Sequence, residues 1–391
     1  MKRFLKWFLA IFILIVCFIY AFNLEYLIKG VRTIYLTGHS TAFLSDYNYF
    51  DNQKIISSNP EPWPLHKKYN TINESESLRD LNVKRKTKSF LVIKNDSILF
   101  EKYFDGYDQN SLSNSFSVAK SIVVSMMFKA IQQGKIKSID QPVGDFFTEY
   151  KEGLASKLTV GDLASMSSGM DWSEKYYKII NITSKSYFTD DLRDLILGQK
   201  IINSPGQGFR YSSGDTQLLA MVIEKATGTT LTNYLTENFW NPMQAENSAL
   251  WQIDSKDKGM EKAYCCIAGT ARDFARFGKL YINNGRWKDE QIIDSSFVQL
   301  AINPVFENTE FYGYGWWLYE FSGVDINTNK VYNKKVFSMN GHRGQFIISF
   351  PEDNIIIVRQ GDLNKKDDKT GISLDLPQYI REGYELAKSI E

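Results

Sequence analysis

Ser117 and Lys120 stand three residues apart at the start of an apolar stretch that ends at Gly134. Residues with this spacing share one face of a helix, so the lysine can reach the serine hydroxyl. A helix that is apolar on nearly all sides is expected to be buried. Burial favours the neutral amine of a lysine, and the helix N-terminus supports negative charge on a nearby oxygen. The pair therefore predicts a nucleophilic serine with Lys120 as its base.

Two further segments could complete such a site, and the tetrapeptide needs them because Ser-x-x-Lys alone is common by chance. A glycine-rich loop delivers Tyr211 directly before a helical stretch that ends at Gly228. A phenol beside a lysine ammonium can become a phenolate and shuttle protons to a leaving group or from water. We therefore take Tyr211 as the third catalytic candidate.

The segment from Asn340 to Gln345 precedes an apolar strand and contains His342 and Gly344. A glycine lets the backbone approach a ligand closely, and free N–H groups at a strand edge can bind an oxyanion. His342 is the histidine with a site-like context, because the other two lie in the N-terminal arm. We expect His342, Gly344 and Gln345 to contact the substrate.

The elements that must position these residues are a pair of hairpins and the helices between them. Residues 89–94 and 97–103 read as strands joined by a tight turn, and residues 344–350 and 355–359 read as a second hairpin before a helix over 378–390. Helical periodicity dominates the sequence between the hairpins. This order predicts an α/β (α+β) fold, with one antiparallel sheet built from both chain ends, flanking helices, and a mostly helical lobe inserted at about 135–335.

The N-terminus predicts a membrane anchor. Lys2, Arg3 and Lys6 precede an uncharged run from Trp7 to Phe22, and no small-residue cleavage site follows it. With the basic residues held inside, the rest of the chain faces the non-cytoplasmic side. We therefore expect a single-pass signal-anchor over residues 1–28, a stalk or surface-hugging linker arm over 29–75, and a catalytic domain over 76–391.

The composition of the chain limits the kinds of partner and cofactor that we expect. Lys and Arg number 46 against 45 Asp and Glu, which leaves a net charge of +1 and no global field for nucleic acid. Cys265 and Cys266 are adjacent and so poorly placed to bond to each other. We expect them to be small buried thiols. The sequence shows no zinc-type spacing, and we expect neither a metal nor a cofactor.

In order and spacing, Ser117-x-x-Lys120, Tyr211-Ser-Ser213 and His342-Arg-Gly344 resemble the Ser-x-x-Lys, Tyr/Ser-x-Asn and Lys-Thr-Gly motifs of serine β-lactamases and penicillin-binding proteins. The resemblance covers about residues 80 to 390. It is closest to the class C-related branch that includes 6-aminohexanoate-dimer hydrolases. The sequence segments 158–172, 271–278 and 312–317 support this resemblance. It implies a β-lactamase/transpeptidase-like fold and a serine hydrolase that forms an acyl-enzyme.

Two positions depart from the family pattern. Ser213 replaces the asparagine and His342 replaces the lysine, and both original residues help to bind β-lactams, so β-lactams are expected to be poor substrates. In the aminohexanoate-dimer hydrolases, a tyrosine on a loop after a Met-Ser-Ser-Gly-like phrase contacts the substrate. Tyr176 is our candidate for that role, and Tyr177 is equally near.

The leading hypothesis is a membrane-anchored serine hydrolase that cleaves an ester or amide bond in a small molecule or short oligomer. The alternative is a penicillin-binding or sensor-like protein, or a degenerate homologue, that acylates slowly without efficient turnover. A third reading is a structural membrane protein without a pocket. Ser117, Lys120 and Tyr211 together favour the first.

Overall fold

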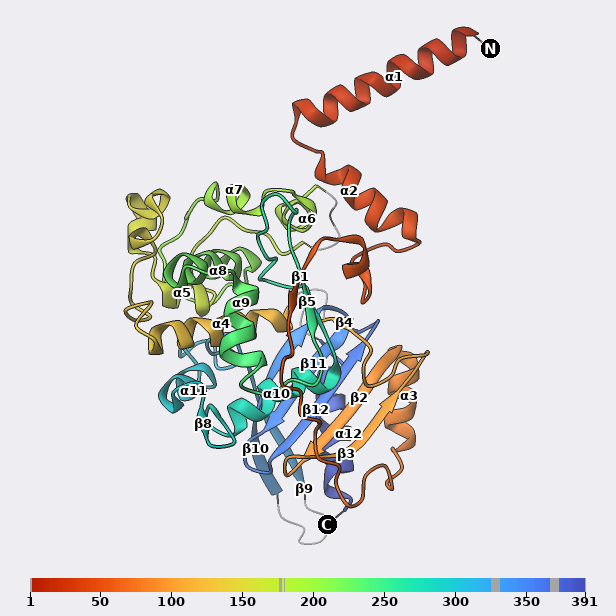
Figure 1. The fold of residues 1–391 in the computed structure, drawn as a ribbon, viewed down its shortest axis with the longest axis vertical. Coiled ribbons are helices and arrows are strands. Elements are labelled where there is room, and N and C mark those ends of the chain that lie inside the picture. The colour runs from red at the N-terminus through yellow and green to blue at the C-terminus, as the bar shows by residue number, and fades with distance from the viewer. Residues whose placement is uncertain (1, 176–177, 179, 325–330, 366–372, 391) are drawn as a thin grey trace.

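Two hairpins rich in β-branched and aromatic residues, one from each end of the chain, join into a single antiparallel sheet (Figure 1). The computed structural model describes residues 2–175, 178, 180–324, 331–365 and 373–390. The sheet has six strands in the order β3-β2-β12-β11-β10-β9. Their bounds are β2 (Thr87–Lys94), β3 (Ser97–Tyr103), β9 (Trp317–Val324), β10 (Val331–Gly341), β11 (Gln345–Phe350) and β12 (Ile355–Gly361). The predicted fold class, with one sheet built from both ends of the chain, is confirmed.

The turns of the hairpins follow the sequence expectation. Asn95 and Asp96 both adopt positive φ between β2 and β3, as a two-residue hairpin turn requires. The first residue of β12 pairs with the last residue of β2, which joins the N-terminal hairpin to the C-terminal one. Strand β9 and the first part of β10 also belong to this sheet, although they lie inside the range 135–335 that we assigned to the helical lobe.

Helices cover both faces of the sheet. Helix α10 (Ala271–Ile282) packs on one face, against β2, β11 and β12. On the other face, α3 (Glu76–Lys84) and α12 (Leu376–Lys388) bury Leu78 and Tyr379 against Phe90 of β2. Two apolar cores result, and the larger one continues from the α10 face into the helical lobe.

The helical lobe is arranged around two long buried helices, which lie beside each other (Figure 1). These are α4 (Val118–Gln132) and α8 (Ser213–Thr227). Gly134 and Gly228 follow their ends with positive φ, as glycine does at helix C-termini. The shorter helices are α5 (Val160–Ala164), α6 (Ile182–Phe188), α7 (Leu192–Leu197), α9 (Leu231–Leu235) and α11 (Ser295–Ala301), and the helical turns are η1 (Tyr35–Thr37), η2 (Asp46–Tyr49), η3 (Val143–Asp145), η4 (Thr148–Tyr150), η5 (Gly153–Lys157), η6 (Thr236–Trp240) and η7 (His342–Gly344).

A second, small sheet ties distant segments to the start of α4. Its strand order is β1-β5-β6-β4. The bounds are β1 (Asn52–Ile55), β4 (Ser113–Asn114), β5 (Ala249–Gln252) and β6 (Ile267–Gly269), and a separate pair is β7 (Arg286–Trp287) with β8 (Glu290–Gln291). Asn52 pairs with Gln252. Part of the segment 29–75, for which we expected a stalk or linker arm, thus lies in a sheet with the main body.

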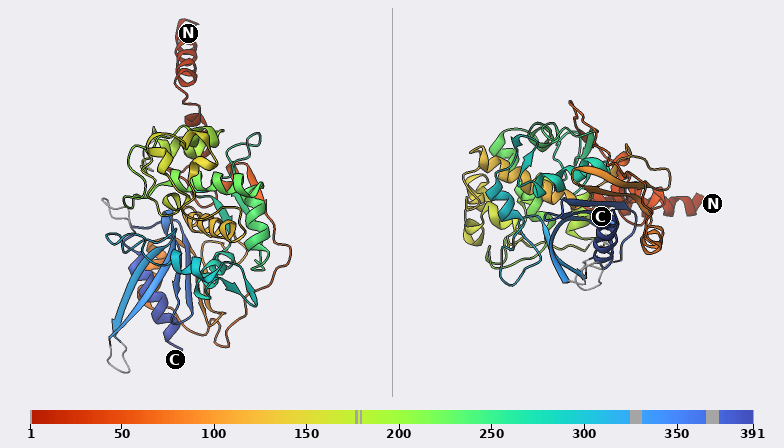
Figure 2. Two further views of the ribbon diagram at one scale, coloured as in Figure 1. Left: turned by 90° about the vertical axis from the view of Figure 1, so that its left-hand side faces the viewer. Right: turned by 90° about the horizontal axis from the view of Figure 1, so that it is seen from below.

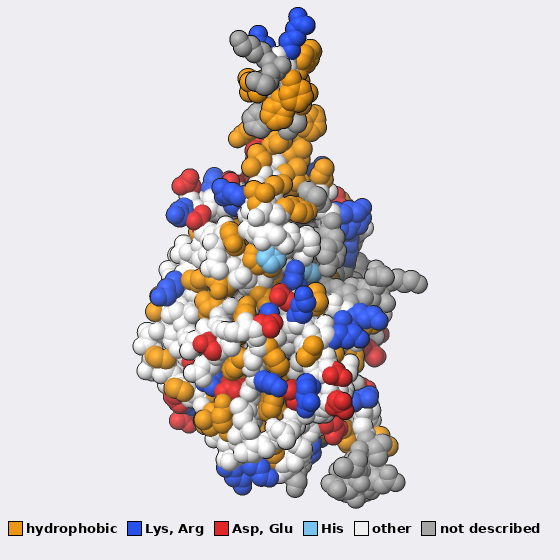
Figure 3. Space-filling model, turned by 90° about the vertical axis from the view of Figure 1, so that its right-hand side faces the viewer, with side chains coloured by type: hydrophobic (Ala, Val, Ile, Leu, Met, Phe, Trp, Pro, Cys, Tyr) orange, Lys and Arg blue, Asp and Glu red, His pale blue; other side chains and the backbone are white. Residues whose placement is uncertain are grey.

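The N-terminal helices stand at the end of the molecule opposite the C-terminus (Figure 2). Helix α1 (Lys2–Ala21) projects away from the body, whereas α2 (Tyr26–Thr33) packs against α6. The stretch Arg3–Ala21 is long and apolar enough to cross a membrane. A signal sequence near an N-terminus has the same length and apolar composition. Figure 3 shows hydrophobic side chains gathered on this projection, above a body with mixed charges.

The expectation of two free thiols at Cys265 and Cys266 was wrong, because these adjacent cysteines form a disulfide. Cys266 has a left-handed backbone with φ of 77°, a local conformation that our argument from adjacency did not consider. The expected burial is confirmed, since both side chains are buried.

Candidate active site

Ser117 is placed by a sharp turn between the small sheet and α4. Ser115 N donates to the carbonyl of Ile267 at 2.8 Å, which fixes the chain two residues before Ser117. Phe116 then adopts φ of 47°, a conformation that costs a bulky residue about 1–3 kcal/mol. Its N–H donates to the side chain of Asn114 at 2.9 Å. The turn leaves Ser117 as the N-cap of α4.

Lys120 lies one helical turn further on and points back at the serine. Its Nζ donates to Ser117 Oγ at 3.0 Å and to the carbonyl of Tyr264 at 2.8 Å. The side chain is buried, and burial lowers the pKa of Lys120 to about 8, while the charge of Glu174 raises it. A lysine with this pKa has a neutral fraction near neutral pH, so it can accept a proton from the serine.

Tyr211 reaches the same serine from the loop before α8. Its hydroxyl interacts with Ser117, which lowers the pKa of the phenol, and the Lys120 Nζ lies 5.0 Å from the centre of its ring. Burial raises the pKa of Tyr211 strongly, and the interaction with Ser117 only partly opposes that rise. The phenolate that we expected is therefore disfavoured. The geometry suits a neutral phenol that donates its proton to a leaving group.

Glu174, which was not among the residues predicted from the sequence, is a carboxylate whose charge raises the pKa of both Lys120 and Tyr211. Glu174 accepts hydrogen bonds from Trp172 Nε1 at 2.7 Å, from Ser213 Oγ at 3.2 Å and from the backbone N–H of Ser213. The available signal was its place two residues before Tyr176, in a loop that we examined only for an aromatic contact. Tyr176 and Tyr177 themselves lie outside the described residues.

The turn between β10 and β11 brings His342 to the nucleophile loop. The His342 ring meets the ring of Phe116 edge to face, with 5.3 Å between their centres. Gly341 permits this approach, because a Cβ there would lie 2.3 Å from the carbonyl oxygen of Ser115. We expected a glycine of this motif to let the backbone approach a ligand, whereas the close approach in the structure is that of Gly341 to the chain that leads to Ser117.

Gly344 ends this turn, and Gln345 begins β11. A Cβ on Gly344 would lie 2.2 Å from Nη1 of Arg359, so the glycine makes room for a buried guanidinium. The Gln345 side chain donates to the carbonyls of His342 at 3.0 Å and Gly361 at 2.8 Å. The space left by Gly344 and the hydrogen bonds of the Gln345 side chain thus stabilise the turn. The backbone N–H of Gln345 follows directly after the turn.

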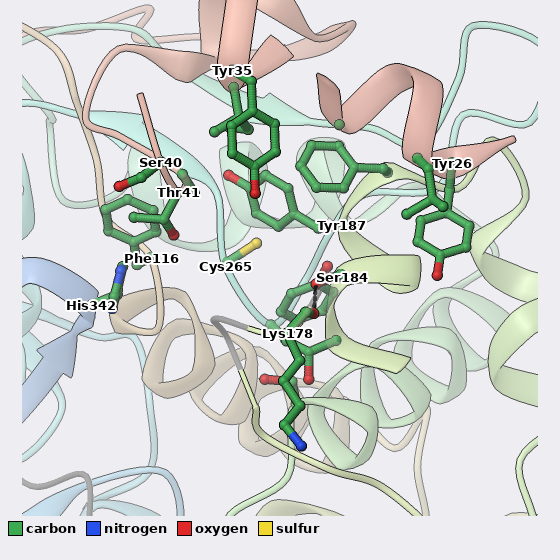
Figure 4. Close-up of a pocket in the computed structure, with 18 of the residues that line it drawn as sticks. Tyr26, Tyr35, Ser40, Thr41, Phe116, Lys178, Ser184, Tyr187, Cys265 and His342 are labelled. Carbon is green, nitrogen blue, oxygen red and sulfur yellow. Dashed lines mark hydrogen bonds between the residues drawn. The ribbon is translucent and has the colours of Figure 1, made fainter. Parts of the chain in front are cut away.

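A cavity of about 150 Å³ opens over Ser117, and we call it the Ser117 cavity (Figure 4). Ser213 and His342 also line it, so the structure brings together one residue from each of the three motifs. Its other lining residues are Tyr26, Leu27, Gly30, Val31, Ile34, Tyr35, Ser40, Thr41, Ala42, Phe116, Lys178, Thr183, Ser184, Tyr187, Phe188, Tyr264 and Cys265.

Comparisons with known proteins fit this arrangement. The curated relatives include the 6-aminohexanoate-dimer hydrolase of Paenarthrobacter ureafaciens, which is 23% identical over 227 residues, 55% of this chain and 57% of the relative. They also include Protein flp of Staphylococcus aureus (strain MW2), which is 23% identical over 181 residues, 44% of this chain and 36% of the relative. The chain thus spans about half or less of the length of these relatives.

Solved structures share the fold over most of both chains. A Bacillus anthracis protein provisionally assigned as a 6-aminohexanoate-dimer hydrolase has a TM-score of 0.69 and 21% identity, and the match covers 89% of this chain and 92% of that one. A class C β-lactamase has a TM-score of 0.58 and 16% identity, with 84% and 99% covered. Residues 80–371 match the family described as Beta-lactamase. The chain therefore belongs to the Beta-lactamase family, within the superfamily of serine β-lactamases and penicillin-binding proteins that its motifs resemble.

Proposed function

We propose that this protein is a membrane-anchored serine hydrolase that cleaves an ester or amide bond through an acyl-enzyme on Ser117. The observation that carries the proposal is the 3.0 Å contact between Lys120 Nζ and Ser117 Oγ. This contact lies in a buried setting that lowers the lysine pKa to about 8. A serine hydroxyl and a base held in this way are the two parts that nucleophilic catalysis needs.

The reaction proceeds in two stages. Neutral Lys120 takes the proton from Ser117 Oγ as that oxygen attacks the substrate carbonyl carbon. The backbone N–H groups of Ser117 and Gln345 hold the resulting oxyanion. Tyr211 gives its proton to the departing alcohol or amine as the bond to the carbonyl carbon breaks, and Lys120 returns a proton to Tyr211. In the second stage neutral Lys120 takes a proton from a water molecule as that water attacks the acyl carbon. The bond between this carbon and Ser117 Oγ then breaks, Lys120 returns the proton to Ser117 Oγ, and the acid leaves.

Linear esters and amides fit this site better than β-lactams. Ser213 stands where the family carries an asparagine, and its hydroxyl and backbone N–H are already bound to Glu174. His342 stands where the family carries a lysine. The name of the Paenarthrobacter relative specifies hydrolysis of a 6-aminohexanoate dimer, which favours including linear amides among the substrates to be tested.

The anchor is the helix α1. Its stretch Arg3–Ala21 is long and apolar enough to span a bilayer, and most of its described side chains are exposed, with none of these buried in the domain. Basic residues precede the apolar run, which favours a cytoplasmic N-terminus and a catalytic domain on the non-cytoplasmic side.

The experiment is a turnover screen of the full-length chain. The panel holds short p-nitrophenyl esters, D-amino-acid amides, linear amide oligomers and a chromogenic cephalosporin. Ser117→Ala should abolish turnover of the substrates that the wild type hydrolyses. Ser115→Ala is the matched control, because Ser115 is a buried serine two residues away and its hydroxyl bonds only to the carbonyl of Phe116 among the described contacts. A single burst of product without further turnover would contradict the hydrolase and favour the sensor-like alternative.

A further inference from the structure

We propose that the substrate carries a hydrocarbon chain, which the Ser117 cavity receives against a wall made by helix α2, so that the N-terminal segment is part of the binding site as well as an anchor. This inference rests on the proposed hydrolase function and names its substrate class. It starts from the position of α2, which begins at Tyr26, only a few residues after the end of the membrane-length helix at Ala21.

The cavity has two walls from distant parts of the chain. One wall is the nucleophile loop with Phe116 and Ser117, joined by His342 from the turn between β10 and β11. The opposite wall comes from the N-terminal segment and includes Leu27 and Val31 of α2. In Figure 4, Tyr35 and Tyr187 face the space between these walls. A substrate carbonyl at Ser117 therefore has the N-terminal segment beside it.

The α2 wall is fixed on the domain by specific contacts. Lys29 Nζ lies 2.6 Å from the Asp190 carboxylate and 2.9 Å from the carbonyl of Asp254. A Cβ on Gly30 would lie 3.3 Å from the ring of Phe188, so the helix backbone packs closely against α6. These contacts hold α2 in place against the helical lobe.

A second tie holds the segment that follows α2. Arg343, next to His342, donates from Nε to the carbonyl of Ala42 at 2.8 Å and pairs with Asp362. The third motif is thus joined directly to the N-terminal segment that lines the cavity. The segment that lines the cavity is therefore held in a fixed position beside the third motif, which favours a binding role for residues 26–42.

The chemistry of the lining points to hydrocarbon. Apolar atoms make up most of the lining surface, and Lys178 is the only lysine, arginine or acidic residue among the described lining residues. Each methylene group moved from water into such a site gains about 0.8 kcal/mol. The exposed apolar surface of α1 leads up to α2 (Figure 3), so an acyl chain dissolved in the bilayer has a short path to the cavity. We infer an ester or amide of a membrane-soluble acyl chain.

Val31 and Ile28 provide a matched pair for the test. Both are branched aliphatic residues on α2, with 47% and 48% of their surface exposed. Val31 lines the cavity and Ile28 does not. The full-length protein in phosphatidylcholine vesicles would be assayed with p-nitrophenyl acetate, butyrate and hexanoate. Wild-type kcat/KM should rise along this series, by up to roughly fourfold for each methylene that is buried.

Val31→Asp should remove most of this rise, so that the ratio of kcat/KM for the hexanoate to kcat/KM for the acetate falls at least tenfold. Ile28→Asp should leave the whole series unchanged. Acetate turnover reports that each variant is folded. If Ser117-dependent acetate hydrolysis is present but kcat/KM does not rise with chain length, the inference is overturned and the hydrolase function stands. Equal effects of the two substitutions would also overturn it. Absence of Ser117-dependent hydrolysis with every ester would overturn the proposed function itself.

Discussion

Glu174 accepts hydrogen bonds from both the backbone N–H and the hydroxyl of Ser213, and this pairing holds a carboxylate close to the Ser117–Lys120 pair. The charge of Glu174 raises the pKa of Lys120 and that of Tyr211. Burial acts in the opposite direction on the lysine and is the larger effect. The protonation state of the base is therefore set by burial and adjusted by Glu174.

This balance predicts the pH dependence of the reaction. Only the neutral amine of Lys120 can accept the serine proton, so kcat/KM should be low below the lysine pKa and rise to a plateau above it, with a midpoint near pH 8. In Glu174→Gln the raising effect of the carboxylate is lost, so the midpoint should move to lower pH. Glu152→Gln, at an exposed glutamate, is the control. A midpoint that moves to higher pH in Glu174→Gln would contradict the assignment.

Tyr211→Phe should affect poor leaving groups most. The high pKa of Tyr211 keeps it protonated and able to donate to a departing amine. Anilide hydrolysis should fall by roughly 10²–10⁴, the usual span for general acid catalysis, and p-nitrophenyl acetate hydrolysis should fall less. Tyr312→Phe, at the ring that packs edge to face on Tyr211, is the comparison. Equal losses on both substrates would remove Tyr211 from the leaving-group role.

Gly341→Ala should disable the site without touching a catalytic side chain. The added Cβ would stand 2.3 Å from the carbonyl oxygen of Ser115, so either the His342 turn or the nucleophile loop must move. A displacement of about 1 Å can cost roughly 10² in rate, and a loss of that order in kcat is expected. Gly198→Ala, where the new Cβ meets only ordinary contacts at 3.4 Å, should have little effect. Full activity in Gly341→Ala would show that the close contact between Gly341 and the Ser115 carbonyl does not position the nucleophile.

The location of the protein follows from its first helix. Cell fractionation should find the full-length chain in membranes, and protease added from the non-cytoplasmic side should digest the domain. Deletion of residues 1–21 should release the protein into the soluble fraction, while α2 and its contacts remain. A mature soluble product that begins near residue 25 would show instead that α1 is a cleaved signal sequence.

Local patterns in the sequence account for much of the fold and for the three catalytic candidates. The β2–β3 turn and the helices α4 and α8 with their terminal glycines are set by neighbouring residues, so periodicity and turn residues reveal them. The helix over 378–390 is confirmed as α12 within two residues at each end. Ser117 and Lys120 are one helical turn apart, so their contact follows from spacing alone.

Features that depend on distant pairing escaped prediction. The small sheet pairs Asn52 with Gln252, and no local pattern in such short strands specifies that partner. Glu174 and Ser213 meet across two loops, which sequence spacing does not show. The α2 wall of the cavity likewise depends on how Lys29 and Gly30 dock on the lobe. These contacts come from tertiary packing, which a single sequence does not display.

Covalent labelling of the full-length protein tests the central claim most directly. A fluorophosphonate should label the wild type once, and mass spectrometry of the digested protein should place the label on Ser117. Labelling should vanish in Ser117→Ala, should be nearly lost in Lys120→Ala, because the base is gone, and should persist in Ser115→Ala. A label on another residue, or a Lys120→Ala protein that reacts like the wild type, would contradict the account of Ser117 as a nucleophile activated by Lys120.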